Sequence, residues 1–339
     1  MFASSDPPIS STLQGIVFKK SQGNYFVHAD GRTVTCAISS RLRKVLVYPT
    51  AAPTSLHHRV KEVKDIQTVD PVAVGDVVQF TDGGHDTGLI TEVLPRKNEL
   101  VRRSAVPMPG AHAREQVIVA NVDQVIAVYP AGQPAKRQWM LDQYLAAAEA
   151  SNLPAHICLT KADLADEAYM REEIELYGRI GYPVVATSAV TGQGLAECKE
   201  ALRGRVSVLV GKSGVGKTSL LNALQPGLGL RVKAVNQHTA EGKHATTHLE
   251  MFDLDIGGSV VDTPGLREFK LWAVNSADLA QLFPEMRPYL GQCKFGADCT
   301  HDHEPGCAVK AAVEAGAISP RRYQSYLRMR SSEGRGGLT

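Results

Sequence analysis

The chain has 339 residues and a formal net charge of +2, from 37 basic and 35 acidic side chains. This length allows two or three domains, each with its own hydrophobic core. The balanced charge excludes an argument for nucleic-acid binding from the whole protein, so only local basic clusters can support one. No segment approaches the roughly 20 consecutive apolar residues that cross a bilayer, and the N-terminus lacks the pattern of a signal peptide. We therefore expect a cytoplasmic protein with no membrane partner, and a monomer.

The N-terminal part, residues 12–105, has the pattern of a small β-barrel. Short strands separated by turn formers are predicted at residues 15–18, 24–27, 33–38, 76–80 and 88–93. Five short strands in so few residues favour an oligonucleotide-binding (OB) barrel. The basic residues between positions 41 and 64 oppose a single acid, Glu62. They form either a solvated loop or a surface that contacts a phosphate backbone.

The middle part, residues 112–274, alternates apolar strands with helical segments. Strands are predicted at residues 117–119, 124–129, 155–159, 184–187, 206–210 and 259–261, and helices at residues 136–150, 167–180, 195–202 and 217–224. This alternation predicts an α/β domain whose mainly parallel sheet is covered by helices on both faces.

A phosphate-binding loop (P-loop) follows the strand at residues 206–210 and opens a helix, which is the context that the G-x-x-x-x-G-K-[ST] motif needs. Its residues, with the serine that follows them, are Gly211, Lys212, Ser213, Gly214, Val215, Gly216, Lys217, Thr218 and Ser219. The backbone N–H groups of such a loop cradle the β-phosphate. We expect Lys217 to reach the β- and γ-phosphates and Thr218 to ligate Mg²⁺.

Two further segments indicate which base the nucleotide carries. They are Thr160, Lys161, Ala162 and Asp163 after one strand, and Ser188 with Ala189 after the next. A carboxylate at Asp163 can accept both N–H donors of guanine, and adenine presents a different donor pattern. Together the two segments favour GTP over ATP.

The remaining nucleotide motif follows the strand at residues 259–261. We expect Asp262 to hold Mg²⁺ through water and the Gly265 N–H to meet the γ-phosphate. A switch threonine, either Thr246 or Thr247, precedes this motif. Ordinary small GTPases place the guanine motifs last, whereas here they come first, so the order is circularly permuted. The chain therefore runs from the γ-phosphate sensor directly into the C-terminal region, and we expect nucleotide state to rearrange that region.

The C-terminal region, residues 275–330, is predicted to be mainly helical and to carry a metal site, and residues 331–339 read as a disordered tail. Cys293, Cys299 and Cys307 lie within fifteen residues, with His301 and His303 between them. Three thiolates and one imidazole suit a closed, structural Zn²⁺ site. The arginines of the last helix either contact RNA or are solvated.

These motifs resemble those of the bacterial ribosome small-subunit-dependent GTPase A family over nearly the whole chain. The matching segments are residues 120–123 (ANVD), 211–219 (GKSGVGKTS), 262–268 (DTPGLRE), 283–285 (FPE), 304–309 (EPGCAV) and 322–326 (RYQSY). The resemblance implies a GTP hydrolase that binds the 30S subunit and its 16S rRNA during late maturation, is stimulated by that subunit and leaves after hydrolysis. It also favours His301 over His303 as the fourth zinc ligand. Two departures are Thr160, where many GTPases have Asn, and a spacing between Cys293 and Cys299 that is one residue longer than in the family.

The residue that orients the attacking water is less evident. Ras-like enzymes place Gln directly after the D-x-x-G motif, and this chain has Leu266 there. His244 lies close to the switch threonines and has a counterpart in the family, so we predict that it orients the water, against the alternative of a solvated loop histidine. His238 and His248 are less well placed. Two other functions compete: a GTP-binding RNA checkpoint protein with little catalysis, and an enzyme that phosphorylates a small molecule.

Overall fold

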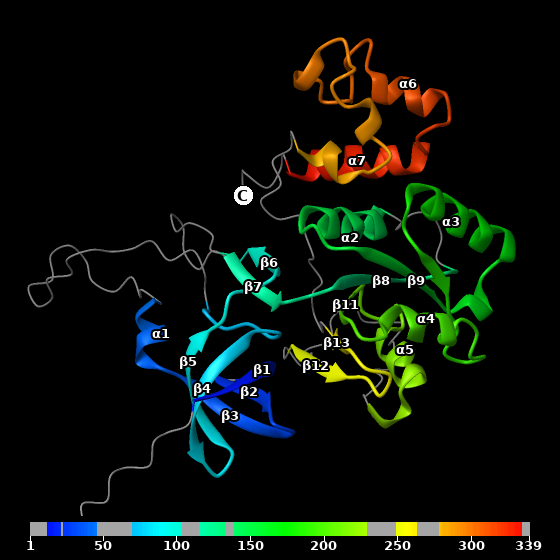
Figure 1. Cartoon of the computed structure of the whole chain (residues 1–339). Helices are drawn as coiled ribbons and strands as arrows, with labels where there is room; N and C mark the ends of the chain where they lie inside the picture. The colour runs from blue at the N-terminus through cyan, green and yellow to red at the C-terminus, as the bar shows by residue number, and fades with distance from the viewer. Residues whose placement is uncertain are drawn as a thin grey trace, which may run out of the picture. The chain divides into compact units, whose positions relative to one another are not determined.

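The computed structural model describes residues 12–21, 23–45, 70–103, 115–132, 139–228, 249–262 and 278–333 (Figure 1). The chain divides into two compact units, which are described separately. The first comprises residues up to Val122 with the short piece His248–Met251, and the second comprises residues 123–247 and 252–339. Strand β12 (Glu250–Asp253) lies where the chain passes from one unit to the other.

The first unit contains a closed five-stranded barrel. Its strands are β1 (Thr12–Ser21), β2 (Asn24–Ala29), β3 (Arg32–Ile38), β4 (Val77–Gly84) and β5 (Thr87–Val93), and the short helix α1 (Ser40–Val45) follows β3. The strand order is β1-β2-β3-β5-β4, and β4 pairs with β1 to close the barrel. All pairs are antiparallel except β3 with β5. The predicted OB-like barrel is thus confirmed.

The barrel core follows from alternation along its strands. Successive side chains of a strand face opposite sides, so every second residue points into the barrel. In β2 these inward residues are Tyr25, Val27 and Ala29, which are buried. Phe80 and Ile90 from β4 and β5 join them at 0% exposure.

A separate hairpin corrects one strand assignment. Residues 117–119 do form a strand, β7 (Glu115–Ala120), but it pairs antiparallel with β6 (Glu99–Arg103) instead of joining the parallel sheet. The hairpin belongs to the first unit, and Val119 also bridges to Val74 beside the barrel. The prediction that this strand joins the parallel sheet is therefore wrong, because a short apolar run does not indicate which strand it pairs with.

The second unit is built on a parallel sheet. Its strands are β8 (Gln124–Pro130), β9 (Ala155–Thr160), β10 (Val184–Ala186), β11 (Val206–Val210) and β13 (Ser259–Asp262), in the order β10-β9-β8-β11-β13. All four neighbouring pairs are parallel. Every residue of β8 is buried, as expected for a central strand covered on both faces.

Helices cover both faces of this sheet. Figure 1 shows α2 (Trp139–Ala150) and α3 (Glu167–Ile180) on one face, and α4 (Leu195–Leu202) and α5 (Lys217–Leu224) on the other. Short 3₁₀ turns, Ala162–Leu164 and Pro226–Leu228, follow β9 and α5. Helix α3 begins at the N-cap Asp166, whose carboxylate accepts a hydrogen bond from the Tyr169 N–H, and it ends at Gly181 in the left-handed conformation. The predicted α/β domain is confirmed.

The C-terminal region is helical and packs against α2. It contains the 3₁₀ turns Leu279–Leu282, Arg287–Tyr289 and Gly296–Asp298 and the helices α6 (Ala308–Glu314) and α7 (Pro320–Glu333). Its core, with Phe283, Met286 and Tyr326, also includes Ala146 of α2. Within the described segments, no helix combines the length and the apolar character that crossing a membrane requires.

Candidate nucleotide site and metal centre

The predicted nucleotide motifs gather at one edge of the parallel sheet. Strands β9, β10, β11 and β13 all run in the same direction, and each leads directly into one of the motifs. Ligands of open parallel sheets bind at the carboxyl ends of the strands. The edge at which Thr160, Ser188, Gly211 and Asp262 lie is therefore the candidate nucleotide site.

The P-loop links β11 to α5 in a conformation that needs glycine. A Cβ atom on Gly211 would lie 2.5 Å from the carbonyl oxygen of Val128, so the loop approaches β8 too closely for any side chain. Gly216, the N-cap of α5, has φ of 106°, which strains other residues. The following helix directs its first N–H groups toward the loop, where an anion binds favourably.

Lys217 and Asp262 lie close together beside this loop. Parallel pairing of β11 with β13 places Asp262 opposite Leu209, two residues before the P-loop. The Lys217 Nζ donates to the carbonyl of Gly211 at 2.6 Å and to that of Lys212 at 3.3 Å. Burial lowers the pKa of Lys217, and the Asp262 carboxylate opposes that change. A partly desolvated ammonium group held over the loop is suited to a phosphate anion.

The two guanine segments form one continuous rim. Lys161 adopts a left-handed conformation with φ of 58°, which turns the chain after β9. The Thr187 N–H donates to the Leu159 carbonyl at 2.7 Å, and the Ala162 N–H donates to the Thr187 carbonyl at 3.0 Å. The Ser188 hydroxyl oxygen accepts hydrogen bonds from the N–H groups of the two residues that follow Ala189. Asp163 and Ala189 are exposed and available to a base.

This rim is hydrogen-bonded to the P-loop. The Thr160 hydroxyl donates to the Val215 carbonyl at 2.5 Å, and the Lys161 Nζ donates to the Gly214 carbonyl at 3.2 Å. The structure thus brings the predicted base and phosphate segments together. Among the other predicted residues, His244, Thr246, Thr247 and Gly265 lie outside the described residues.

The Cys/His cluster of the C-terminal region also comes together. The ligand atoms of Cys293, Cys299, His301 and Cys307 lie within 4.8 Å of one another, and all four residues are buried. The His301 Nδ1 lies 3.4 Å from the sulfur atoms of both Cys293 and Cys307, which are 3.8 Å apart. Ligands at 2.0–2.3 Å from a tetrahedral Zn²⁺ are separated by roughly 3.3–3.8 Å, so the cluster fits one zinc ion.

Neighbouring groups hold the metal loop in place. The Glu304 carboxylate accepts from the N–H groups of Thr300 at 2.9 Å and Asp302 at 3.0 Å, on either side of His301. From α7, the hydroxyl of Tyr323 donates to the His301 carbonyl at 2.7 Å and that of Tyr326 to the Thr300 carbonyl at 2.8 Å. These contacts fix the backbone on which the imidazole is carried.

Zinc binding can be tested with the two histidines. We expect the purified protein to contain one Zn²⁺ per chain and the His301→Ala variant to bind it at least about 10-fold more weakly, because a ligand is lost. His303→Ala is the matched control, since the His303 side chain is 82% exposed and outside the cluster. Zinc content is measured by atomic emission after dialysis against a chelator. Equal retention by both variants would refute the assignment of His301.

Three of the four arginines of α7 are paired with acids, which differs from their predicted roles. Arg322 is neither solvated nor available to RNA, because it is 1% exposed and paired with two acids. Arg321 pairs with Glu173 of α3, Arg330 pairs with Asp302, and Arg328 stacks on the Trp139 ring at 4.4 Å. A basic run on a helix looks the same in sequence whether its partners are water, RNA or buried carboxylates.

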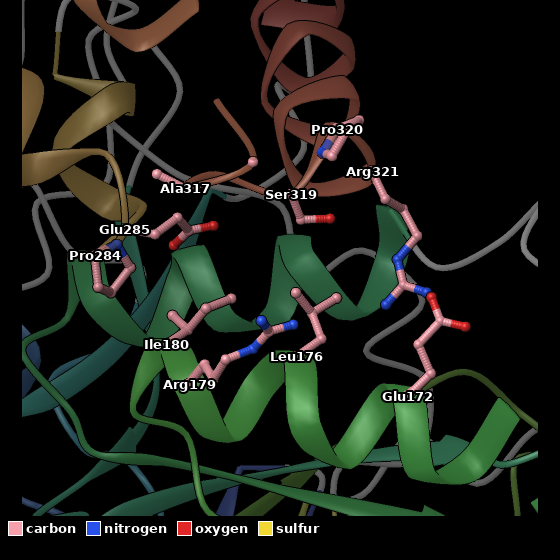
Figure 2. Close-up of a pocket in the computed structure, with 11 residues that line it drawn as sticks. Glu172, Leu176, Arg179, Ile180, Pro284, Glu285, Ala317, Ser319, Pro320 and Arg321 are labelled. Carbon is pink, nitrogen blue, oxygen red and sulfur yellow. The ribbon is translucent and has the colours of Figure 1, made fainter. Parts of the chain in front are cut away.

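A cavity of about 480 Å³ lies between α3 and the C-terminal region (Figure 2). Its lining includes Leu176 and Arg179 of α3 and Ser319, Pro320 and Arg321 at the start of α7. Acidic Glu172 and Glu285 face the same space, so its lining carries charges of both signs. None of the predicted nucleotide or metal residues lines it.

Comparison with known proteins gives concordant matches. A family model described as RsgA GTPase matches residues 93–272. A relative from Gemmatimonas aurantiaca, named small ribosomal subunit biogenesis GTPase RsgA, is 46% identical over 261 residues, covering 76% of this chain and 83% of the relative. The crystal structure of YjeQ from Thermotoga maritima is similar with a TM-score of 0.70 and 32% identity, covering 95% of this chain and 98% of that one. A structure of YloQ, described as a circularly permuted GTPase, has a TM-score of 0.65 and 28% identity over 97% of both chains.

Proposed function

Because the chain belongs to the RsgA GTPase family, we propose that it is a GTP hydrolase that acts in late maturation of the small ribosomal subunit. The observation that supports the nucleotide part is a pair of hydrogen bonds, from Thr160 to the Val215 carbonyl and from Lys161 to the Gly214 carbonyl. They join the segment proposed to bind the base to the loop proposed to bind the phosphates. The subunit part rests on the name of the relatives. The partner would be the 30S particle with its 16S rRNA, the compartment the cytoplasm, and the working form a monomer.

In this proposal each part of the site has a defined task. Asp163 accepts the guanine N–H groups, and the P-loop N–H groups and Lys217 hold the phosphates. The hydroxyl of Thr218 and the carboxylate of Asp262 are hard oxygen donors that suit Mg²⁺, which supplies positive charge to the phosphates when bound. Thr246 or Thr247 completes that shell, and Gly265 senses the γ-phosphate. Zn²⁺ has a structural role in the C-terminal region.

The water that attacks the γ-phosphate needs an orienting group, because Leu266 can neither donate nor accept a hydrogen bond. We propose His244 for this task. His244→Ala should leave GTP affinity within about twofold and lower stimulated turnover about 100-fold, the usual scale for a positioned acid–base group. His238→Ala, in the same segment, is the control. Unchanged stimulated turnover of His244→Ala would eliminate this role.

Phosphate release tests the proposed function directly. GTP hydrolysis is measured for the protein alone and with small subunits, large subunits or bare RNA, with ATP as the control nucleotide. Stimulation by small subunits alone is expected, followed by dissociation of the GDP-bound protein from the particle. GTP binding without stimulated turnover would favour the checkpoint alternative, and equal use of ATP would contradict the guanine assignment.

A further inference from the structure

The cavity between α3 and the C-terminal region has no task in the proposed function. Its volume of about 480 Å³ falls within the range of pockets that hold ligands. One wall is a face of α3, on which Leu176 and Ile180 are only partly buried. The C-terminal region supplies the other wall, with Pro284, Ala317 and Pro320 (Figure 2). Single exposed apolar side chains are ordinary, but apolar side chains gathered around a hollow are typical of a binding site.

Contacts within the same unit hold the two walls in place. Arg321, at the start of α7, pairs with the buried Glu173 of α3. In the turn before α7, the N–H groups of Ala317 and Ile318 both donate to the Ala312 carbonyl, at 2.9 and 3.2 Å. A ligand that enters a cavity with fixed walls loses less free energy to ordering the protein. The cavity is therefore formed before any ligand arrives.

Two charged residues of the lining, Glu172 and Arg179, are available to a ligand. Both are exposed, and neither forms an ion pair within the part of the chain that the structure describes. The other two charged residues, Arg321 and Glu285, are each paired with a buried side chain of opposite charge. Glu172 and Arg179 are seven residues apart on one face of α3, which separates them by about 10 Å along the helix axis. Leu176 lies between them.

This order of acid, apolar side chain and base distinguishes between classes of ligand. The cavity is lined by two acids and two bases, whereas a surface for an RNA backbone carries excess positive charge. An extended peptide carries apolar side chains and charges of both signs, and about 10 Å corresponds to three of its residues. The lining therefore favours a peptide over RNA.

We infer that the cavity is a docking site for a peptide segment of a partner protein. In this arrangement a basic side chain of the segment faces Glu172, an apolar one covers Leu176 and an acidic one faces Arg179. The identity of the partner rests on the proposed function, which makes it a protein of the small ribosomal subunit.

Exchanging the two available charges tests the docking site without changing the net charge. The double variant Glu172→Arg with Arg179→Glu places like charges opposite the segment, and we expect it to bind purified small subunits at least about 10-fold more weakly than the wild type. Arg171→Glu with Glu175→Arg is the matched control, since it makes the same exchange at exposed positions of α3 outside the cavity. It should bind within about twofold of the wild type. Binding is measured by co-sedimentation, and GTP hydrolysis without subunits checks that each variant is folded. Arg179→Glu alone, at an exposed position, should weaken binding about threefold and serves if the double variant does not fold.

A cross-linker in the cavity identifies the class of partner. We expect p-benzoylphenylalanine in place of Leu176 to cross-link to a protein of the purified small subunit. Cross-linking to rRNA alone, or to nothing, would overturn the inference, and so would wild-type affinity of the charge-exchanged variants. In those cases the wild type would still bind small subunits and be stimulated by them, so the proposed function would stand. A wild-type protein that small subunits neither bind nor stimulate would instead overturn the proposed function and the inference together.

Discussion

Replacing Asp163 by Asn is expected to convert a guanine site into a xanthine site. In the proposed site the carboxylate would accept two N–H donors from guanine, whereas an amide can accept only one while presenting a donor of its own. GTP affinity should fall at least about 100-fold, because the base then faces a mismatched donor. Xanthosine triphosphate carries a carbonyl in place of the exocyclic amino group and should bind Asp163→Asn better than the wild type does. Competition against a fluorescent nucleotide measures both changes.

The chain supplies a matched control three residues further on. Asp166 is the N-cap of α3 and is equally close to the site in sequence, but its carboxylate accepts from the Tyr169 N–H at 2.9 Å. Asn caps helices about as well as Asp, so Asp166→Asn should change neither stability nor base preference. If Asp163→Asn bound GTP as tightly as the wild type, the base would have to be recognised elsewhere, and the assignment of this segment would be wrong.

The parts of the fold that the sequence predicted are those governed by local pattern. Alternating apolar residues predicted the barrel strands, and the G-x-x-x-x-G-K-[ST] run between a strand and a helix predicted the P-loop. The Cys/His cluster is also local, since its four ligands lie within fifteen residues. In each case the sequence distance between the informative residues is short, so spacing alone restricts the geometry.

Long-range contacts are the features that sequence reasoning missed. The Thr160 hydroxyl and the Val215 carbonyl are 55 residues apart, and Arg322 and Asp142 are 180 residues apart. Neither pair has a sequence pattern, because a threonine at a strand end and an arginine in a basic helix are common. The sequence of a strand also does not indicate which strand it pairs with. The prediction that β7 joins the parallel sheet is wrong for that reason. Only the folded chain decides which carbonyl or carboxylate such a group meets.

Arg322 marks the contact between the C-terminal region and the helices of the parallel-sheet domain. Its guanidinium donates to Asp142 of α2 at 2.7 Å and to Glu285 at 2.6 Å, and it stacks over the Phe283 ring at 4.6 Å. The Tyr177 hydroxyl of α3 donates to the same Asp142 oxygen at 2.8 Å. Burial opposes the charge of Arg322, but Asp142 and Glu285 raise its pKa well above the ordinary value. The group therefore stays charged, and the buried carboxylate of Asp142 and the half-buried one of Glu285 depend on it.

These ion pairs bear on the expectation that nucleotide state rearranges the C-terminal region. The permuted order suggests that the chain after Gly265 pulls directly on that region. Arg321 and Arg322 also attach it to α3, which begins a few residues after Asp163, and to α2. Any rearrangement of the C-terminal region relative to these helices must break buried ion pairs. Motion that carries α2 and α3 along with the region avoids that cost.

Arg322→Met should accordingly destabilise the protein by about 3–5 kcal/mol, because removing one member of a buried ion pair leaves its partners charged and unpaired. Arg328→Met is the control on the same helix: Arg328 is exposed and stacks on Trp139, so its loss should cost about 0.5–1 kcal/mol. Urea unfolding followed by fluorescence gives both values. Adding Asp142→Asn to Arg322→Met should recover part of the loss, since the variant then buries one charge fewer. If instead Arg322→Met cost no more than Arg328→Met, the ion pairs would not hold the region to α2 and α3, and the direct pull through the chain after Gly265 would again be the simpler route.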